Sequence, residues 1–304
     1  MTNVCWIVQL FVGFNLSFRA EPRNLFINFV TTMDKNRNIQ VMGIVNLTDD
    51  SYYSGSRCPD VNTAIERIAT LISEGADIID IGACSTRPGS LPVGADEEWS
   101  RLEPVLRAVK ENLPDIRISI DTYWASVVEK AYEIIGCFIV NDISAGEDDP
   151  QMLPTVGRLG LQYIAMHKRG TPEIMQENVS YDNLLEDIVG YFEIFSKKAE
   201  KFGIYNWILD PGFGFSKTIE QNYNLLRGVS RFKQIILSEN TPVSILIGVS
   251  RKSMIYRHFG ISPDEALPAT QVLHLYALQN GADILRVHDV AEAKRTIELY
   301  KMLD

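Results

Sequence analysis

The sequence has few cysteines and histidines, and none of them has the spacing of a metal site or a disulfide framework. The four cysteines are far apart and include no C-x-x-C pair, and the four histidines form no H-x-x-x-H pair. These absences argue against a zinc-binding or disulfide-rich protein. We expect all four cysteines to be free thiols of a cytoplasmic protein. They are Cys5, Cys58, Cys84 and Cys137.

Long apolar runs and an excess of positive charge are also missing. No apolar run reaches the roughly 18 to 20 residues that a membrane-spanning helix needs. Lysine and arginine number 29 against 39 aspartates and glutamates, which gives a net charge of -10. This balance argues against a nucleic-acid or anionic-membrane surface, although a local cluster of cations can still bind a small anion.

From Ile39 onward, short apolar runs alternate with segments that have apolar residues at helical spacing. Such stripes are formed by Ala64, Ile68, Leu71 and Ile72, and by Leu184, Ile188, Tyr191 and Phe195. The predicted strands are 40–45, 78–81, 116–120, 138–140, 163–166, 207–209, 244–248 and 284–287. The predicted helices are 61–73, 96–111, 123–134, 150–158, 183–202, 219–237, 263–279 and 291–302.

This alternation predicts a single (β/α)8 TIM barrel. Eight strand and helix units in about 265 residues match that fold in number and size. A doubly wound sheet would need a glycine-rich dinucleotide turn after its first strand, and NLTDDSYYSGS at 46–56 does not have that pattern. No composition break or low-complexity linker divides the chain after residue 36, so we expect one domain at 36–304.

Residues 1–35 do not follow the barrel pattern. They are rich in Trp, Ile, Val, Leu and Phe, but lack the basic start and the small-residue cleavage site of a secretory signal. Three interpretations stay open. The start codon is assigned upstream of the true one at Met33, the segment is a secretory signal, or it is an apolar extension that covers the barrel floor or a partner subunit.

Polar residues follow the apolar runs at the ends of the predicted strands. Because active sites of such barrels lie at the carboxyl ends of the strands, this repetition predicts an enzyme. Ionised groups at such positions need a ligand or a partner. The residues are Asn46, Asp80, Asp121, Asn141, His167, Asp210, Ser250 and Arg286.

These residues predict a ligand with two different ends. One end is a flat heterocycle, since carboxylates accept paired hydrogen bonds from a guanidine-like edge. Its binding groups are Asp121, Asn141, Asp210 and Lys252, with Ile143, Met166, Phe213 and Phe215 as apolar neighbours. The other end is a phosphate or diphosphate, bound by Arg87, Arg286 and His288 with Asn46, Ser85 and Thr86. The amide oxygen of Asn46 is also a suitable ligand for Mg2+.

Several of these residues have a simpler interpretation. Asp80 is either an anchor behind the binding residues or a helix cap. For His167 we favour a buried hydrogen bond over a binding role, and for Cys84 an inert small side chain over a nucleophile. GFGFSKT at 212–218 lacks the G-x-x-x-x-G-K-[ST] spacing of a phosphate loop, so we discount that match.

Eight segments together resemble the dihydropteroate synthase family in sequence and order. They cover the chain from about Ile39 to the C-terminus. The most specific parts are STRPG, DPGFGF, GVSRKS and RVHDV. The segments are VMGIVNLTDDS at 41–51, GADIIDIGACSTRPGS at 75–90, ISIDTY at 118–123, IVNDISAG at 139–146, AMHKRGTP at 165–172, ILDPGFGFSKT at 208–218, IGVSRKS at 247–253 and ILRVHDV at 284–290.

The resemblance implies a (β/α)8 barrel that joins p-aminobenzoate to 6-hydroxymethyl-7,8-dihydropterin diphosphate, with Mg2+ near Asn46. Pterin binding is then carried by Asp121, Asn141, Met166, Asp210, Phe215 and Lys252. Diphosphate binding falls to Asn46, Arg87, Arg286 and His288, and aminobenzoate binding to Thr86, Pro88, Ser250 and Lys252. The residues implied to act directly in the reaction are Asp121, Asp210, Lys252, Arg286 and His288. Sulfonamides are the implied competitive inhibitors.

The chain departs from the family pattern at a few positions of its first two loops. Asp49, Tyr52 and Ser54 replace residues common in the first loop, and Cys84 stands where Glu is common. These changes leave a catalytically silent pterin-binding protein as an alternative. A second alternative is a methyltetrahydrofolate-type methyltransferase barrel, which would not need the cations of the diphosphate site.

The resemblance also implies a homodimer. The last predicted helix is one candidate for the interface, because it carries several apolar residues, and packing on its own barrel is the other interpretation. These residues are Ile297, Leu299, Met302 and Leu303.

Overall fold

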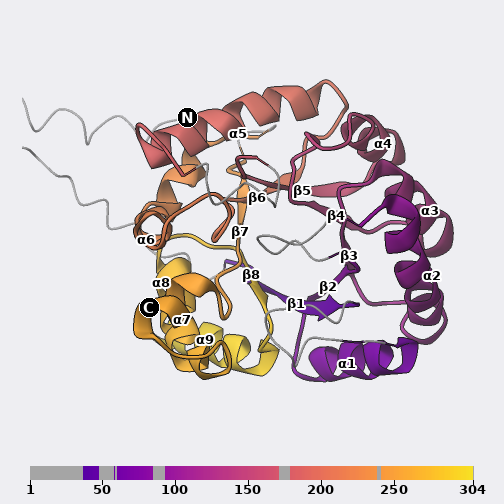
Figure 1. The fold of residues 1–304 in the computed structure, drawn as a ribbon, viewed down its shortest axis with the longest axis horizontal. Helices are drawn as coiled ribbons and strands as arrows, with labels where there is room; N and C mark the ends of the chain where they lie inside the picture. The colour runs from indigo at the N-terminus through magenta and orange to yellow at the C-terminus, as the bar shows by residue number, and fades with distance from the viewer. Residues whose placement is uncertain are drawn as a thin grey trace, which may run out of the picture. The chain divides into compact units, whose positions relative to one another are not determined.

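The computed structural model describes residues 37–47, 58, 60–84, 93–170, 179–237 and 241–303. Parallel strands pair in chain order, and the last pairs with the first, so the sheet closes into a barrel. Figure 1 shows the helices arranged around this ring of strands. The predicted (β/α)8 barrel is confirmed. Its strands are β1 (Gln40–Asn46), β2 (Ile78–Gly82), β3 (Ile118–Asp121), β4 (Ile139–Asp142), β5 (Gln162–Met166), β6 (Trp207–Asp210), β7 (Ser244–Ile247) and β8 (Ile284–Val287).

The helices between the strands mostly agree with the predicted segments. In the described part of the chain, none of them combines the length and apolar character needed to cross a membrane. The α-helices are α1 (Val61–Ser73), α2 (Ala95–Asn112), α3 (Ala125–Ile135), α4 (Met152–Leu159), α5 (Leu184–Glu200), α6 (Ile219–Arg227), α7 (Ser253–Phe259), α8 (Leu267–Gln279) and α9 (Val290–Leu303).

The predicted helices after β6 and β7 were wrong in their bounds. The helix predicted at 219–237 ends as α6 at Arg227, and a 3-10 helix follows at Val229–Gln234. Gly228 separates the two, and a Cβ at this position would lie 2.4 Å from Leu185 Cδ2. The sequence pattern also did not predict α7, and α8 begins after a 3-10 helix at Asp264–Ala266. The spacing of apolar residues therefore did not locate these boundaries.

The interior of the barrel changes from apolar to polar along the strands. An apolar layer fills its lower part, formed by Met42, Ile78, Ile139, Ile164, Ile208, Leu246 and Ile284. Side chains of a strand alternate between its two faces. The inward positions two residues further along therefore include Asp80, Asn141, Asp210 and Arg286. The polar end of the barrel is its carboxyl end, where a TIM barrel places its site.

The outward faces of the strands and the inner faces of the helices form the main core. Ala64, Ile68 and Leu71 of α1 are buried as predicted. In α5, Ile188 and Phe195 are buried, whereas Leu184 and Tyr191 are half-buried.

Helix α9 packs on its own barrel. Ile297 and Tyr300 are buried in the core, so Ile297 is not an interface residue. Leu299, Met302 and Leu303 are 63%, 84% and 72% exposed. These three residues stay candidates for a subunit contact.

Candidate functional site

The predicted binding residues that the structure describes lie at the carboxyl end of the barrel. Asp121 ends β3 and lies opposite Asn141 of β4 in the sheet register. Asp210 ends β6 and lies opposite Met166 of β5. The expectation that these side chains lie together is therefore confirmed.

Arg286 of β8 lies at the centre of this polar group. Its Nε donates to Asp80 Oδ2 at 2.6 Å, and its Nη2 donates to Asp121 Oδ2 at 2.9 Å. Asp80, which is fully buried in β2, also accepts from Asn141 Nδ2 at 3.2 Å. Asp80 is thus an anchor that orients Arg286 and Asn141, and it is not a helix cap.

The carboxylates of the site are held in a poorly hydrated environment. Burial raises the pKa of Asp121 to about 7, with Arg286 opposing this change and Asp80 adding to it. Burial also raises the pKa of Asp210, although Lys252 and the Gly212 N–H oppose it. A ligand that donates hydrogen bonds to these carboxylates would stabilise their ionised forms.

Lys252 extends from the loop after β7 toward Asp210. Its Nζ donates to Phe213 O and lies 4.9 Å from the centre of the Phe215 ring. Burial lowers the pKa of Lys252 to about 8, and Asp210 opposes this effect. Lys252 therefore joins the charged part of the site to its aromatic wall.

An apolar wall lies beside the carboxylates. Tyr123, Ile143 and Met166 form a buried cluster at the barrel mouth. Cys84, Trp124 and Phe215 pack against it. Sequence reasoning missed Tyr123 and Trp124, although they directly follow the strand that ends in Asp121. Burial raises the pKa of the Cys84 thiol, which agrees with an inert side chain.

His288 does not carry the positive charge that the sequence suggested. Burial, together with the charge of nearby Arg286, lowers its pKa to about 3. Its backbone N–H donates to Ser250 Oγ at 3.2 Å. A neutral imidazole can still donate a hydrogen bond to a phosphate oxygen. Among the described residues of the predicted diphosphate group, the positive charge therefore comes from Arg286.

His167 lies behind the site and not in it. Its Nδ1 is 3.1 Å from the Nζ of Lys217, and its ring packs against the edge of Tyr191. The predicted role in a buried hydrogen bond is confirmed. Lys217 also donates to two backbone carbonyls. Its amino group is thus bonded within the protein, which agrees with our interpretation that GFGFSKT is not a phosphate loop.

Sequence reasoning also missed Arg251 and Asp289, which join the loops after β7 and β8. Each is next to a predicted site residue in sequence, Lys252 and His288. That adjacency was the signal available in the sequence, but only the structure shows that they form a pair.

Several predicted residues lie outside the described part of the chain. The extension at 1–35 is among them, so its three interpretations stay predictions. The same holds for Asp49, Tyr52 and Ser54 of the first loop, and for Ser85, Thr86, Arg87 and Pro88 of the second loop.

Oxygen atoms suited to Mg2+ lie beside Gly82. A Cβ at Gly82 would be 3.7 Å from Asp121 Oδ2 and 3.8 Å from Asn46 Oδ1. These carboxylate and amide oxygens are hard ligands, and Mg2+ commonly takes its other ligands from water and substrate phosphates. Within the described ranges, no three His, Cys, Asp or Glu side chains are grouped as a metal site. Asn46 Oδ1 and Asp121 Oδ2 are thus oxygens of the kind that Mg2+ takes, although Asp121 Oδ2 also accepts from Arg286.

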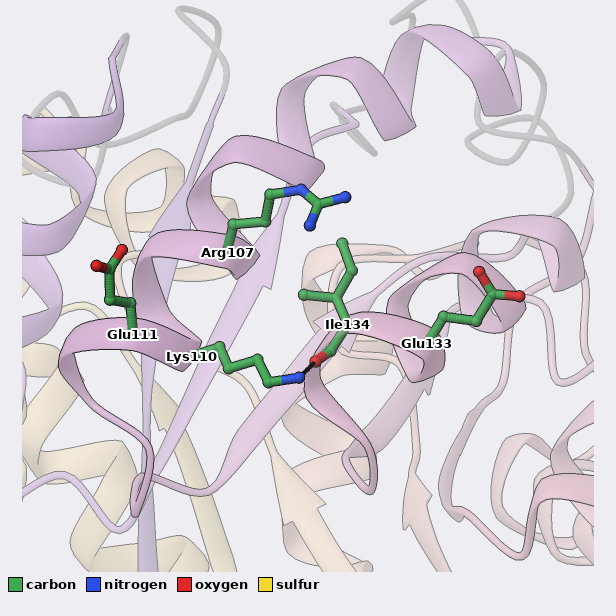
Figure 2. A pocket seen from close by; sticks show the side chains of 5 residues that line it. All are labelled: Arg107, Lys110, Glu111, Glu133 and Ile134. Carbon is green, nitrogen blue, oxygen red and sulfur yellow. Dashed lines mark hydrogen bonds between the residues drawn. The ribbon is translucent and has the colours of Figure 1, made fainter.

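A separate cavity of about 540 Å³ lies between α2 and α3. Figure 2 shows its lining residues and the hydrogen bond from Lys110 to the Ile134 carbonyl. They are Arg107, Lys110, Glu111, Glu133 and Ile134. They lie in the last turns of their helices, just before β3 and β4 begin. The cavity is therefore near the amino end of the strands, away from the polar mouth.

Comparison with known proteins gives matches over most of the chain. A family model described as pterin binding enzyme matches residues 42–288. The folate synthesis bifunctional protein, mitochondrial, of Pisum sativum is 40% identical over 281 residues. That match covers 88% of this chain and 54% of the pea protein, so the chain spans about half the length of this relative.

A bacterial relative is matched over nearly its whole length. The dihydropteroate synthase of Clostridium beijerinckii is 37% identical over 262 residues, which cover 85% of this chain and 92% of that protein. Among solved structures, the Yersinia pestis dihydropteroate synthase in complex with a sulfonamide drug has a TM-score of 0.81 and 33% sequence identity. The match covers 89% of this chain and 96% of that one.

Proposed function

This chain belongs to the pterin binding enzyme family, and from this premise we propose that it is a dihydropteroate synthase. This transferase would join p-aminobenzoate to 6-hydroxymethyl-7,8-dihydropterin diphosphate, forming 7,8-dihydropteroate and releasing diphosphate. The observation that carries the proposal is the convergence of Asp121, Asn141 and Asp210 beside an apolar wall at the barrel mouth. Named relatives with the same activity support it.

The pterin would bind between the carboxylates and the apolar wall. Asp210 is suited to accept two parallel hydrogen bonds from the guanidine-like edge of the ring. Asn141 offers both an acceptor and donors, although its amide is shared with Asp80. Met166 and Phe215 would contact the faces of the ring, and the missed residue Tyr123 belongs to the same wall.

The diphosphate would bind on the side of Arg286, Asn46 and His288. Arg286 has a planar guanidinium that is suited to phosphate oxygens. It is already held by Asp80, so it needs little reorientation to meet an anion there. Arg87 stays a predicted contact of the same group. Asn46 and Asp121 would hold Mg2+, which would supply further positive charge to the diphosphate.

The aminobenzoate would bind above the pterin, next to the loop after β7. Ser250 and Lys252 are its predicted contacts from that loop, and Thr86 and Pro88 are its predicted contacts from the second loop. Ser250 is buried, and its hydroxyl oxygen already accepts from the His288 N–H. We therefore expect its remaining O–H donor to be the group that reaches the substrate.

The charges of the site suit a dissociative reaction. The bond between the pterin methylene carbon and the diphosphate oxygen would break first, and the positive charge would delocalise into the dihydropterin ring. Asp121 and Asp210 would stabilise that charge, while Arg286 would stabilise the departing diphosphate. The amine nitrogen would then bond to the methylene carbon and lose one proton to water. Kinetics that require the amine before diphosphate departure would contradict this order.

Sulfonamides are proposed to compete with p-aminobenzoate. The support comes from a similar protein, whose solved structure contains a sulfonamide drug. Competition would appear as a sulfonamide effect on the KM for p-aminobenzoate with kcat unchanged. An unchanged KM at saturating drug would refute it.

A homodimer is proposed through the exposed apolar residues of α8 and α9. Val272 and Tyr276 of α8 are 66% and 38% exposed, and α8 packs against α9, which carries Met302. Val272→Asp together with Met302→Glu should convert a dimer to a monomer in light scattering. Ile194→Glu on α5, where the native residue is 70% exposed, is the control. A monomeric wild-type protein in light scattering would contradict the proposal.

A cytoplasmic location stays a proposal as well. It is supported by the thiol of Cys137, which is exposed and forms no disulfide. Fractionation of native cells with an antibody to the barrel would test it, and recovery from an organelle or a secreted fraction would contradict it.

The first experiment is to measure diphosphate release by the purified protein. It would use Mg2+ and the dihydropterin diphosphate, with and without p-aminobenzoate. Amine-dependent release that collapses in Asp210→Asn, and persists in Asp182→Asn at an exposed position, would support the synthase and the pterin role of Asp210. Pterin binding without release would favour a catalytically silent pterin-binding protein.

A further inference from the structure

Lys217 lies beneath the loop that follows β6 and is almost fully buried, with 3% exposure. The loop folds around its ammonium group. Nζ is 2.9 Å from Gly212 O, 3.0 Å from Phe215 O and 3.1 Å from His167 Nδ1. An ammonium group has three N–H donors, so these three acceptors use all of them.

This arrangement also defines the state of His167. Burial lowers the pKa of Lys217 to about 7, and Asp210 opposes this effect. In its charged form Lys217 can only donate, so Nδ1 of His167 is then unprotonated and the imidazole proton is on Nε2. Burial and the charge of Lys217 lower the pKa of His167 well below its usual value, consistent with a neutral ring. Lys217 and His167 therefore act as one buried hydrogen-bonded pair.

The loop above this pair has an unusual backbone. Gly212, Gly214 and Ser216 have φ angles of 73°, 82° and 52°, all in the left-handed region. For a residue with a side chain, such as Ser216, this conformation costs on the order of 1 kcal/mol. Without opposing hydrogen bonds, the inward carbonyls of Gly212 and Phe215 would be free to turn away. Lys217 holds both of them.

The same loop carries two groups of the pterin site. The Gly212 N–H donates to Asp210 Oδ1 at 2.8 Å, while the carbonyl of Gly212 accepts from Lys217. The His167 N–H donates to Asp210 O at 3.1 Å. Hydrogen bonds thus connect Lys217 to Asp210 by two routes, one through Gly212 and one through His167. Lys217 also holds the backbone that positions the Phe215 ring.

We propose that Lys217 is a positioning residue of the pterin pocket, which keeps Asp210 and Phe215 in their binding geometry without touching a substrate. This inference rests on the proposed function. Its specific consequence is a much larger loss of affinity for the pterin than for the aminobenzoate, because Asp210 and Phe215 are proposed pterin contacts, whereas Lys252 is the one predicted aminobenzoate contact that also touches this loop.

Lys217→Met tests the proposal because methionine fills a similar volume and has no donors. We expect the KM for the dihydropterin diphosphate to rise at least tenfold, while the KM for p-aminobenzoate changes less than twofold. Pterin affinity, measured by calorimetry with 6-hydroxymethylpterin, should fall by the same factor as the KM rises.

Lys233→Met is the matched control. Lys233 also donates from a partly buried position to a backbone carbonyl, Val243 O, and it pairs with Asp283. These groups lie just before β7 and β8, at the other end of the barrel. The control should lose stability and keep the wild-type KM for the pterin. A Lys217→Met enzyme with the same behaviour would overturn the proposal.

Substitution of His167 tests the pair if Lys217→Met does not fold. The oxygen of Asn can replace Nδ1 as an acceptor, whereas Leu cannot. His167→Leu should raise the pterin KM several-fold, and His167→Asn should restore most of the affinity. Equal, wild-type affinities in both variants would overturn the inference.

The test also separates this inference from the proposed function. A wild type that binds pterin without releasing diphosphate would refute the synthase, and the calorimetric comparison would still decide the role of Lys217. A wild type that binds no pterin would overturn both.

Discussion

Arg251 and Asp289 form a buried ion pair with two contacts, which ties the loop after β7 to the loop after β8. Arg251 Nε is 2.8 Å from Asp289 Oδ2, and Nη2 is 2.9 Å from Oδ1. The remaining Nη1 donates to the carbonyls of Pro263 and Asp264 at 2.9 Å and 2.7 Å. Arg251 precedes Lys252 in sequence and Asp289 follows His288, so the pair joins the two loops that carry these site residues.

Replacing Asp289 by Asn should destabilise the protein strongly. The guanidinium of Arg251 would remain buried beside a neutral amide, and breaking a buried pair in this way costs about 3 to 5 kcal/mol. Urea unfolding would measure the loss. Glu103→Gln is the control, because it breaks the exposed Arg107–Glu103 pair, for which we expect about 1 kcal/mol or less. Similar small losses in both variants would contradict the assigned importance of the buried pair.

Replacing Arg286 by Met should reduce amine-dependent diphosphate release by about a hundredfold or more. The change removes the cation proposed for the leaving group and leaves Asp80 and Asp121 facing each other without the charge between them. Arg227→Met, at an exposed position of α6, should release diphosphate at the wild-type rate. Near-normal release by the Arg286 variant would remove this residue from the diphosphate site.

Glu98 of α2 should make stability depend on pH. It is fully buried, and within the described ranges its carboxylate oxygens accept no hydrogen bond of good geometry, although Thr122 lies close enough to act on them. Burial raises its pKa from 4.5 to about 7, with Thr122 and Arg101 opposing the change and Asp121 adding to it. Because the folded-state pKa is the higher one, this stabilising effect is complete below pH 4.5 and is lost as the pH rises through about 7.

Glu98→Gln removes this titration. The unfolding free energy of the variant minus that of the wild type should therefore increase between pH 4.5 and pH 8 by up to about 3 kcal/mol. Urea unfolding at several pH values would show this change. Glu111→Gln, at an exposed position on the same helix, serves as the control for the amide substitution. A difference that stays constant with pH would show that Glu98 keeps an ordinary pKa.

Gly212→Ala should unfold the loop that carries the pterin residues. A Cβ there would lie 2.0 Å from His167 O, and the residue has a φ of 73°. We expect a loss of several kcal/mol or insoluble protein, because backbone must move to relieve the clash. Gly190→Ala in α5 is the opposite case, since nothing lies within 4 Å of the added carbon. It should raise the unfolding free energy by about 0.5 to 1 kcal/mol. Equal stabilities in thermal unfolding would contradict both expectations.

The elements that the sequence predicted well are those with a strong local signal. The helix at Val61–Ser73 has a regular apolar stripe and a capping Asp60, and its predicted bounds agree with the structure. The helix predicted at 219–237 was wrong at its end. Apolar residues continue past Gly228, but α6 ends at Arg227 and a 3-10 helix follows. The spacing of apolar residues does not distinguish these two helix types.

The site likewise has features that the local sequence predicted and features that only the structure shows. Polar residues at strand ends predicted which side chains meet, because the closed sheet brings the carboxyl ends of all strands to one mouth. The sequence did not reveal that Arg286 is held by Asp80 and Asp121, or that Arg251 pairs with Asp289, since these partners are 206, 165 and 38 residues apart.

The sequence by itself determined the barrel, the order of its elements and the set of polar residues at its mouth, because hydrophobic period and glycine-rich turns are local properties of the chain. Only the tertiary structure decided how these residues are paired and charged. Burial makes His288 neutral, and the folded loop encloses Lys217. Hydrogen bonding and desolvation depend on which distant groups are brought together, and those contacts exist only after the chain has folded.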